Sequence, residues 1–424
     1  MPGKTISEKI LSAKSGSDTR AEDLVICNVD YAMGTDGSVP MAIDYFEQMG
    51  GTCVFDPERI VFVMDHYNPS AGSTAAALQD RMREFAGKHR IAVHEVGDGI
   101  SHQLMVETGR TRPGGLLIGA DSHSVTGGAL NAFATGIGSS DLAAAMICGR
   151  IWLKVPQTIR VVLDGLPPAG VYPKDIALAL AGRLTADGSA YQAIEFEGPA
   201  ADAMDLEDRL VLSNMAVEVG AKAGIFRADS KTIEYLKART SEEYQAVQPD
   251  RDAQYSREIV LDVSSLEPEI ARPHAVDNVA RLREALGTPI QMVYLGTCTG
   301  GRVRDFHQAL RILDAAGRLA PGVQLVATPA SRGVEIELQR DGSLEKLRAL
   351  GATLTPPGCG SCCGTAGPIP ADGANVISTA NRNFKARMGN ARASIYLASP
   401  AACAAAAVTG RITDPRGLRE STSK

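Results

Sequence analysis

The sequences LGTCTGGR (residues 295–302) and PGCGSCCG (residues 357–364) decide how this chain is interpreted. Cys298 follows an apolar run, and Cys359 and Cys362 form a C-x-x-C about sixty residues later. The many glycines let the backbone wrap closely around a bulky inorganic group. Thiolates are soft ligands that suit iron–sulfur clusters or zinc, and a cluster that only transfers electrons usually has four cysteines. Three cysteines leave one metal position open, as a Lewis-acid catalyst requires.

Other interpretations of the cysteines stay open on spacing alone. A C-x-x-C in a cytosolic protein is also typical of a redox pair or of half a zinc site. Cys363 directly follows Cys362, and because neighbouring side chains diverge we expect it to be a bystander. Four further cysteines lie among apolar or small residues, and we expect ordinary buried thiols at Cys27, Cys53, Cys148 and Cys403.

Length and composition limit the class of protein. The chain has 424 residues, which predicts two or three domains, and its 43 glycines with few aromatics favour an α/β fold. The formal charge is −6 and no basic run stands out, so we expect no nucleic-acid partner. No stretch reaches the roughly 18 to 20 apolar residues of a membrane span. The scattered cysteines do not form a small disulfide scaffold, which favours a cytoplasmic location.

Strand and helix patterns alternate through the first part of the chain. Residues 59–64, 91–96 and 115–118 are short apolar runs that predict buried strands, and residues 73–88 have helical periodicity. This alternation predicts mostly parallel sheets with helices on both faces. Ligands of such sheets bind beyond the carboxyl ends of the strands.

Three domains are predicted, at residues 1–157, 158–286 and 287–424. The second opens with a strand at 158–163 and contains a helix at 210–223. The third opens with a strand at 290–295, which leads to the first cysteine. It ends with a helix for which Ser399 is the predicted N-cap and Gly410 the C-terminal stop.

Histidines accompanied by carboxylates lie at the predicted strand ends. Asp65-His66 follows one strand directly, and Asp121-Ser122-His123 follows another. A neighbouring carboxylate fixes the tautomer of a histidine and raises its basicity. The pair at 65–66 taken alone favours a turn aspartate beside a partly exposed histidine.

Several separated motifs, in one order along the chain, carry a resemblance to a known family. They include TISEKIL at 5–11, GADSH at 119–123 and STANRNFKARMG at 378–389. The chain resembles the aconitase superfamily, most closely the large subunits of the 3-isopropylmalate dehydratase and homoaconitase branch. The resemblance implies an aconitase-like α/β fold, with three domains of mostly parallel sheets around a central cluster cleft. It also implies that the swivelling fourth domain is absent.

The resemblance implies a role for individual residues. The cofactor would be a [4Fe-4S] cluster with three cysteine ligands and one open iron, and its metal ligands would be Cys298, Cys359 and Cys362. Asn214 and Glu218, four residues apart, share a helix face. Two arginines can hold carboxylates with paired hydrogen bonds. The implied catalytic residues are Asp65, His66, His102, Asp121, His123 and Glu218; the substrate-binding residues are Ser122, Arg382 and Arg387; and Asn214 and Asn381 neighbour the cluster.

The sequence departs from the family pattern beside the first cysteine. The family usually has Cys-Thr-Asn there, whereas this chain has Gly300 after Cys298-Thr299, so an amide hydrogen bond near the cluster or substrate is lost. In addition, no segment before Lys424 resembles the swivelling domain with its serine base. We therefore expect a separate small subunit to supply that domain and base.

The resemblance implies a hydro-lyase that dehydrates and rehydrates a hydroxy di- or tricarboxylic acid, most closely a 3-isopropylmalate dehydratase. Homocitrate-type and 2,3-dimethylmalate or citramalate substrates stay open, because the family's partner subunit forms much of the substrate pocket. Two alternatives come from other classes: an RNA-binding regulator with the aconitase fold, and a zinc or redox protein that uses the C-x-x-C.

Overall fold

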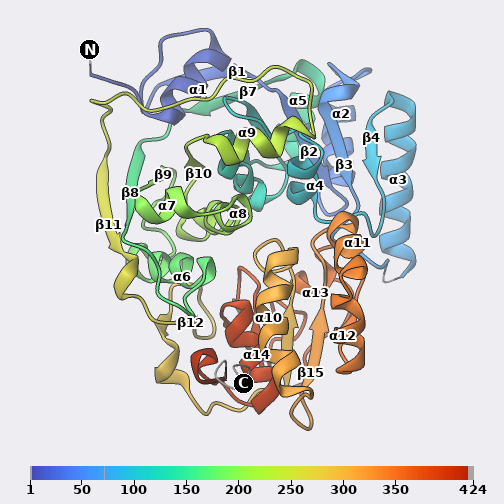
Figure 1. The fold of residues 1–424 in the computed structure, drawn as a ribbon. Coiled ribbons are helices and arrows are strands. Elements are labelled where there is room, and N and C mark those ends of the chain that lie inside the picture. Colours follow the sequence, from blue (N-terminus) through green and yellow to red (C-terminus); the bar gives the residue numbers. More distant parts are fainter. Residues whose placement is uncertain (1, 71, 419–424) are drawn as a thin grey trace.

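The computed structural model describes residues 2–70 and 72–418 of the chain. The described residues form three larger β-sheets and one two-stranded sheet, with helices packed against them. In Figure 1 the first two thirds of the chain form the upper part, and the last third, orange to red, forms the lower part. Residues 419–424 lie outside the described residues.

The first sheet has five parallel strands in the order β4-β3-β2-β5-β6. The predicted strands at 59–64, 91–96 and 115–118 and the predicted helix at 73–88 are all confirmed within it. The strands are β2 (Tyr31–Thr35), β3 (Ile60–Val63), β4 (Ala92–His94), β5 (Leu116–Gly119) and β6 (Phe133–Gly136). The helices are α1 (Ile6–Ser15), α2 (Val39–Gln48), α3 (Ser73–His89), α4 (Ser101–Glu107), the 3-10 helix η2 (Ser122–Leu130) and α5 (Ser139–Cys148).

A separate antiparallel pair of strands, β1 (Leu24–Asn28) and β7 (Arg150–Lys154), lies beside this sheet. It is the two-stranded sheet of the described structure, and Figure 1 draws it close to α1 and α5.

The second sheet has four parallel strands in the order β10-β9-β8-β11. The predicted helix at 210–223 is wrong in its bounds. The observed helix begins at Leu206 and ends at Met215, a 3-10 turn follows, and Gly220 in the left-handed region (φ 87°) ends that turn before a strand begins at Ala223. The strands are β8 (Thr158–Asp164), β9 (Ala193–Glu197), β10 (Ala223–Phe226) and β11 (Arg257–Asp262), and the helices are α6 (Pro173–Leu184), α7 (Pro199–Ala203), α8 (Leu206–Met215), η3 (Ala216–Val219) and α9 (Ser230–Lys237).

The third sheet has seven strands in the order β13-β12-β18-β17-β14-β15-β16. Its strands from β18 to β16 are parallel, and β12 and β13 add an antiparallel edge. The strands are β12 (Glu269–Ala271), β13 (Val279–Arg281), β14 (Met292–Leu295), β15 (Gln324–Ala327), β16 (Thr353–Leu354), β17 (Asn375–Ser378) and β18 (Ser394–Leu397). The helices are α10 (Val303–Ala316), α11 (Arg332–Arg340), α12 (Ser343–Ala349), α13 (Gly360–Cys363) and α14 (Pro400–Thr409).

The expectation of mostly parallel sheets is confirmed, whereas the division of the chain into three domains stays a prediction. Strands β12 and β13 come from residues before the predicted boundary at 286, yet they pair into the third sheet. The final helix α14 begins and ends as predicted, with Gly410 in the left-handed region (φ 71°), although the Ser399 side chain makes no capping hydrogen bond.

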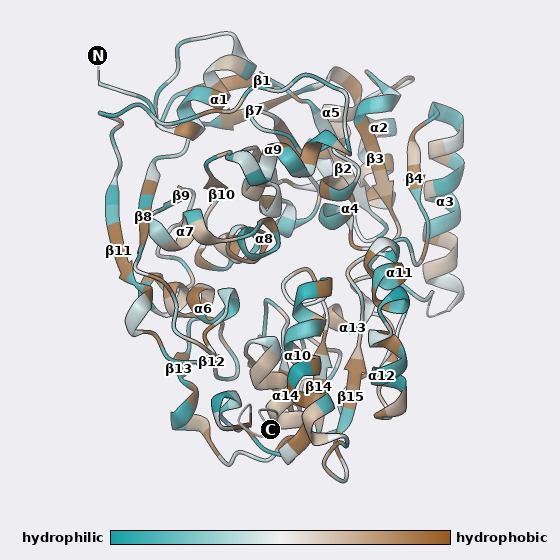
Figure 2. Ribbon diagram, in the orientation of Figure 1, coloured by the Kyte–Doolittle hydropathy of each residue, from teal (hydrophilic) through white to brown (hydrophobic). Residues whose placement is uncertain are grey.

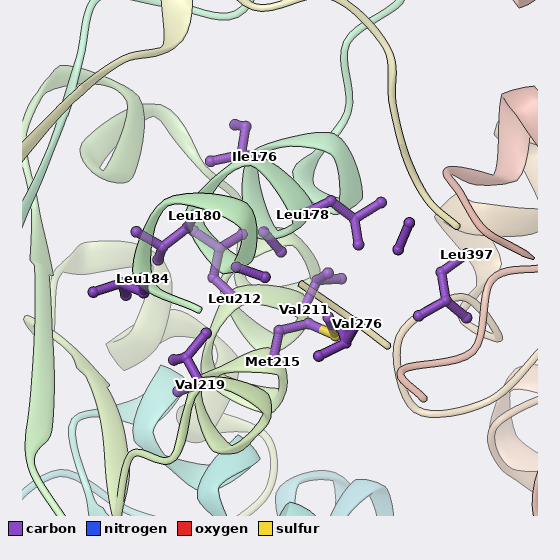
Figure 3. Packing of buried hydrophobic residues seen from close by; sticks show 14 of the residues in the cluster. Ile176, Leu178, Leu180, Leu184, Val211, Leu212, Met215, Val219, Val276 and Leu397 are labelled. Carbon is purple, nitrogen blue, oxygen red and sulfur yellow. The ribbon is translucent and has the colours of Figure 1, made fainter. Parts of the chain in front are cut away.

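Apolar side chains fill the interior between the sheets and their helices. Figure 2 shows brown, hydrophobic strands inside and teal, hydrophilic stretches on outer helices such as α3 and α12. In Figure 3, Leu180 and Leu184 of α6 lie beside Leu212 and Met215 of α8, and the same cluster of buried residues extends to Leu397 of β18. This packing fixes α6 between the second and third sheets.

Two expectations about the remaining chain have different outcomes. No helix in the described residues combines the length and apolarity that crossing a membrane requires. Of the four cysteines expected to be buried, Cys27 and Cys403 are buried, whereas Cys53 and Cys148 are exposed, so that expectation is wrong for the latter two. Cys53 lies in the loop after α2 and Cys148 is the last residue of α5, where the chain turns at the surface.

Candidate active site

Two strands of the first sheet carry two of the predicted motifs at the same edge. Asp65 and His66 follow β3, and Asp121, Ser122 and His123 follow β5. Both strands pair in parallel with β2, one on each side of it, so their carboxyl ends lie at the same edge of the sheet. This is the edge at which open α/β sheets bind ligands.

The carboxylate of Asp121 lies among three histidines. Its oxygens are 3.5 Å from His66 Nε2, 3.7 Å from His102 Nδ1 and 3.9 Å from His123 Nδ1. Burial raises the pKa of Asp121, but the nearby imidazoles outweigh burial and hold this pKa well below its usual value. The carboxylate therefore stays ionised at neutral pH.

Asp65 and His66 form a close pair. Asp65 Oδ1 is 2.6 Å from His66 Nδ1, and Asp65 Oδ2 accepts a hydrogen bond from the Ser101 amide at 2.7 Å. Burial lowers the pKa of His66, but Asp65, aided by Asp121, outweighs burial and raises this pKa well above its usual value. His66 is therefore an imidazolium at neutral pH.

Asp36, at the carboxyl end of β2, supports this pair and was missed in the sequence. Its carboxylate accepts hydrogen bonds from the amides of His66 (2.9 Å) and Tyr67 (3.1 Å) and from Gln79 Nε2 (2.9 Å). Burial, followed by the charge of Asp65, raises the pKa of Asp36. In the sequence an aspartate before a glycine indicates only a turn, so the pattern contained no signal for this role.

His102, in α4, differs from the other two histidines. Its side chain is almost fully buried, and neither ring nitrogen has a hydrogen-bond partner among the described residues. Burial lowers the pKa of His102 to about 4, so the ring is neutral at neutral pH. A buried polar group without a partner is costly, and such a group is suited to a ligand that completes its hydrogen bonds.

His123 is connected to the arginine motif through Glu218. Glu218 Oε1, in η3, is 2.7 Å from His123 Nε2 and accepts a hydrogen bond from Arg382 Nε at 2.8 Å. Burial raises the pKa of Glu218, but His123 and Arg382 outweigh burial and lower it. The first, second and third sheets therefore meet in one chain of charged groups.

Two asparagines connect α8 with the first cysteine. Asn214 donates from Nδ2 to Thr126 Oγ1 at 2.8 Å and accepts from Asn381 Nδ2 at 3.1 Å. The same Asn381 amide lies 3.2 Å from Cys298 Sγ, and Asn381 Oδ1 has no partner among the described residues. Both asparagines thus neighbour the sulfur that the sequence singles out.

The C-x-x-C turn packs against the loop that follows His66. The Cys359 amide donates to the Asp65 carbonyl at 2.7 Å. A Cβ on Gly358 would lie 2.5 Å from Asn68 Nδ2, and one on Gly360 would lie 2.3 Å from the Asn68 carbonyl oxygen. Only glycine permits this approach, which brings the second cysteine loop to the histidines.

The three predicted ligand cysteines form a set of sulfur donors that suits a soft metal group. Burial, with the nearby Cys362, raises the pKa of Cys298 to about 12, and burial, with Asp65 and Cys298, raises the pKa of Cys359 well above its usual value. Without a cation these thiols stay protonated, whereas a metal centre would hold them as thiolates. The ligand atoms of Asp65, His66 and Cys359 lie within 4.8 Å of one another, which places Cys359 at the histidine site.

Arg387 and Cys363 lie beside the same turn. Arg387 Nη2 is 3.4 Å from Cys362 Sγ, and its Nε has no partner among the described residues. Cys363 Sγ is 3.1 Å from the Cys359 carbonyl oxygen and 3.0 Å from Thr365 Oγ1, so its thiol is hydrogen-bonded within the turn.

A close neighbour explains why glycine occupies position 300. A Cβ at this position would lie 2.2 Å from Thr379 Cβ, so a side chain here would require Thr379 to move. The amide that the family usually has at this position is absent, and Asn381 is the amide that contacts Cys298.

Lys174 is a second residue that the sequence did not reveal. It is almost fully buried in the first turn of α6, and its Nζ donates to Thr299 Oγ1 (3.2 Å) and to the carbonyls of Thr379 (3.1 Å) and Ala380 (2.6 Å). Burial lowers the pKa of Lys174 to about 8, opposed by the charges of Cys298 and other groups. One ammonium thus connects the loop of Cys298 with the loop of Asn381.

The sequence is similar to a known family and to individual members of it. The model of the aconitase family (aconitate hydratase) matches residues 8–288 and 283–410. The chain is 47% identical over 417 residues to "3-isopropylmalate dehydratase large subunit 1" of Thermotoga maritima, a match that covers 98% of this chain and 99% of that protein. It is 45% identical to the protein of the same description from Methanopyrus kandleri, with the same coverage of each chain.

Two further similarities extend this comparison. The chain is 44% identical to the "Probable methanogen homoaconitase large subunit" of Methanosarcina mazei, over 93% of this chain and 100% of that protein. In fold it is similar to the crystal structure of aconitase X (holo-form) from Thermococcus kodakaraensis, with a TM-score of 0.50 and 13% identity over 86% of this chain and 88% of that chain. The latter likeness concerns the fold alone, and it agrees with the predicted aconitase-like architecture.

The burial of Lys174 predicts a pH dependence of stability in the cluster-free protein. The pKa of Lys174 is about 8 in the folded chain and 10.5 ordinarily. Between these values the unfolded chain keeps a proton that the folded chain releases, so the free energy of unfolding rises with pH. Relative to Lys174→Met, the wild-type protein should gain about 2 kcal/mol between about pH 7.5 and 9.5 in urea titrations.

The exposed Lys237 of α9 provides the control for this measurement. Lys237→Met should follow the wild-type pH dependence closely, because its side chain is mostly in solvent. A difference between wild type and Lys174→Met that does not change with pH would contradict the prediction.

Proposed function

The chain belongs to the aconitase family, and on this basis we propose that it is the large subunit of a hydro-lyase that acts on 3-isopropylmalate. The enzyme removes water from this hydroxy acid and adds it back with the positions exchanged. One observation carries the proposal: identity of 45% and 47%, over 98% of the chain, to two proteins described as 3-isopropylmalate dehydratase large subunits. Convergence of the histidines with Asp65 and Asp121 at one sheet edge supports it.

A second substrate is favoured by one observation. Identity of 44% to a protein described as a homoaconitase large subunit, over that protein's full length, is nearly as high as the identity to the dehydratases. Homoaconitase activity is therefore the alternative within the same reaction class. The sequence also leaves dimethylmalate and citramalate open as substrates.

Cys298, Cys359 and Cys362 would hold a [4Fe-4S] cluster. With three cysteine ligands, such a cluster has one iron that serves as a Lewis acid for hydroxyl and carboxylate oxygens. The chain supports the group in three ways: Asn381 donates toward Cys298, Arg387 toward Cys362, and the buried Lys174 ammonium supplies positive charge nearby.

The charged residues around the cysteines would bind the substrate and move a proton. His66, held as an imidazolium by Asp65, would donate a proton to the departing hydroxyl. Arg387 and Arg382 would hold carboxylates. Arg387 Nε is unpaired among the described residues. Arg382 donates its Nε to Glu218, so its two terminal nitrogens are the groups that would contact the substrate. Neutral His102 would complete its hydrogen bonds with the same ligand.

The α-proton must be removed by a base, and we propose that a partner chain supplies it. The relatives' description as large subunits supports a small-subunit partner. The swivelling domain and serine base expected from the family would then cover the histidines and exclude water. The cytoplasmic location stays a prediction.

The experiment that tests the function combines the reconstituted chain with a candidate small subunit. Hydration and dehydration are measured with 3-isopropylmalate, homocitrate-type acids, dimethylmalate and citramalate, each with and without the partner. We expect the highest kcat/KM with 3-isopropylmalate and little turnover by the large chain alone. If a cluster-loaded complex turns over none of these acids, the proposed function is wrong. If the large chain is fully active without a partner, the proposal that the partner supplies the base is wrong.

The proposed ligation predicts that Cys362 is required for cluster retention, whereas its neighbour Cys363 is not. Cys298→Ser, Cys359→Ser and Cys362→Ser should each fail to retain a full cluster after anaerobic reconstitution, because a thiolate ligand is lost. Cys363→Ser is the matched control, since its thiol is hydrogen-bonded within the turn, and it should retain wild-type iron and labile sulfide. Full cluster content in Cys298→Ser would contradict this ligation, and zinc without sulfide would favour the zinc alternative.

The proposed carboxylate clamp predicts that charge alone is insufficient at Arg387. Arg387→Lys keeps the charge but loses the planar fork that holds a carboxylate with two hydrogen bonds. The complex should lose about 2 kcal/mol of transition-state stabilisation, or about thirtyfold in kcat/KM. Arg392→Lys, on an exposed side chain paired with Asp372, is the control. Near-wild-type kcat/KM in Arg387→Lys, with cluster content unchanged, would count against the clamp.

A further inference from the structure

An apolar patch is exposed on the two-stranded sheet. Ile26 of β1 lies directly opposite Trp152 of β7, and Leu24 is two residues before Ile26 on the same face. The exposed fractions are 74% for Leu24, 64% for Ile26 and 64% for Trp152, which is the only tryptophan of the chain. We call these three residues the β1–β7 patch.

The opposite face of the same strands explains why the patch is unusual. Cys27, Ile151 and Leu153 point inward and are buried in the core of the first sheet. An antiparallel pair with one buried face ordinarily has polar residues on the other. A contiguous group of large apolar side chains in solvent marks an interaction site, and tryptophan is the residue most enriched among interface hot spots.

A hollow connects the patch with the candidate active site. The cavity has a volume of about 530 Å³, and its lining includes Trp152, Tyr191, Val217, Gly136 and Ser122. Ser122 Oγ is 3.4 Å from His123 Nδ1, and Val217 directly precedes Glu218. A molecule seated on the patch and in the hollow would therefore border the histidine site.

Charged side chains of both signs lie at the hollow, because Lys222 and Asp141 are both among its lining residues. The ammonium groups of Lys154 and Lys222 lie over the ring of Tyr191, at 5.3 and 5.2 Å from its centre. Lys154 is paired with Glu22, whereas Lys222 has no ion pair within 4.0 Å among the described residues. The chemistry that fits the patch is an apolar segment, and Lys222 provides one ammonium group for a carboxylate at the edge of that segment.

We propose that the β1–β7 patch and its hollow are the docking surface for the small subunit. This inference rests on the proposed function, which requires a second chain to complete the site. That chain must lie close to Ser122 and His123, and the hollow extends from Ser122 to Trp152 of the patch. A second copy of this chain would cover the patch but would bring no new group to the histidines.

The single tryptophan makes the surface directly measurable. The large chain is labelled with 5-fluorotryptophan, reconstituted with its cluster, and titrated with the unlabelled small subunit. The single fluorine resonance should shift on binding, and its broadening by a soluble paramagnetic agent should fall at least threefold, because the indole becomes covered. No change in either quantity in a complex that forms would overturn the proposal.

Two variants and a control separate docking from misfolding. Trp152→Lys and Ile26→Lys should each weaken binding of the small subunit at least tenfold, with unchanged circular dichroism and cluster content. Leu286→Lys replaces an apolar residue of similar exposure, 48%, in the turn before β14 and should change affinity less than twofold. Equal affinity of all three variants for the small subunit would overturn the proposal. Self-association of the large chain alone that covers the Trp152 indole would overturn it as well.

The same complex distinguishes failure of the surface from failure of the function. Dehydratase activity with an uncovered Trp152 means that the function holds and the docking surface is wrong. A covered Trp152 without activity on any of the acids means that the surface holds and the assigned reaction is wrong.

Discussion

The candidate site depends on the interaction of the Asp121 carboxylate with the histidines around it. Three histidines, one from a loop and two from the helices α4 and η2, lie within 3.9 Å of its carboxylate. Its backbone position is fixed as well, because Oδ1 caps η2 by accepting the amide of His123 at 2.8 Å. The parallel sheet places this carboxylate beside that of Asp65, so one sheet edge holds an imidazolium and a neutral imidazole close together.

Lys174, which is positive when ionised, and the cysteines, which are negative when ionised, are buried in the same interior. Burial lowers the pKa of the lysine and raises the pKa values of Cys298 and Cys359, so each group alone is driven toward its neutral form. A thiolate centre and an ammonium group stabilise each other's charged forms when both are present. The position of the lysine is fixed by the packing of α6 on α8, which Figure 3 shows.

Local patterns predicted the strands and their ends, and with them the positions of His66 and His123, because periodicity is a property of consecutive residues. The helix at 210–223 was predicted too long because apolar spacing continues through η3 until Gly220 turns the chain. Asp36 and Lys174 were missed because their partners are distant in sequence: Lys174 contacts residues more than a hundred positions later. The contacts of Lys174 arise only when the second and third sheets meet, and those of Asp36 only when β2, the loop after β3 and α3 pack together.

The two exposed thiols have a consequence for handling the protein. Cys53 and Cys148 lie in solvent, whereas the three sulfurs at the candidate site are buried or partly buried. In air, exposed thiols of different molecules join into disulfides. Covalent dimers and larger species in a non-reducing gel would then report storage history rather than native assembly. The same accessibility allows selective alkylation of these two sulfurs while a bound cofactor shields the others.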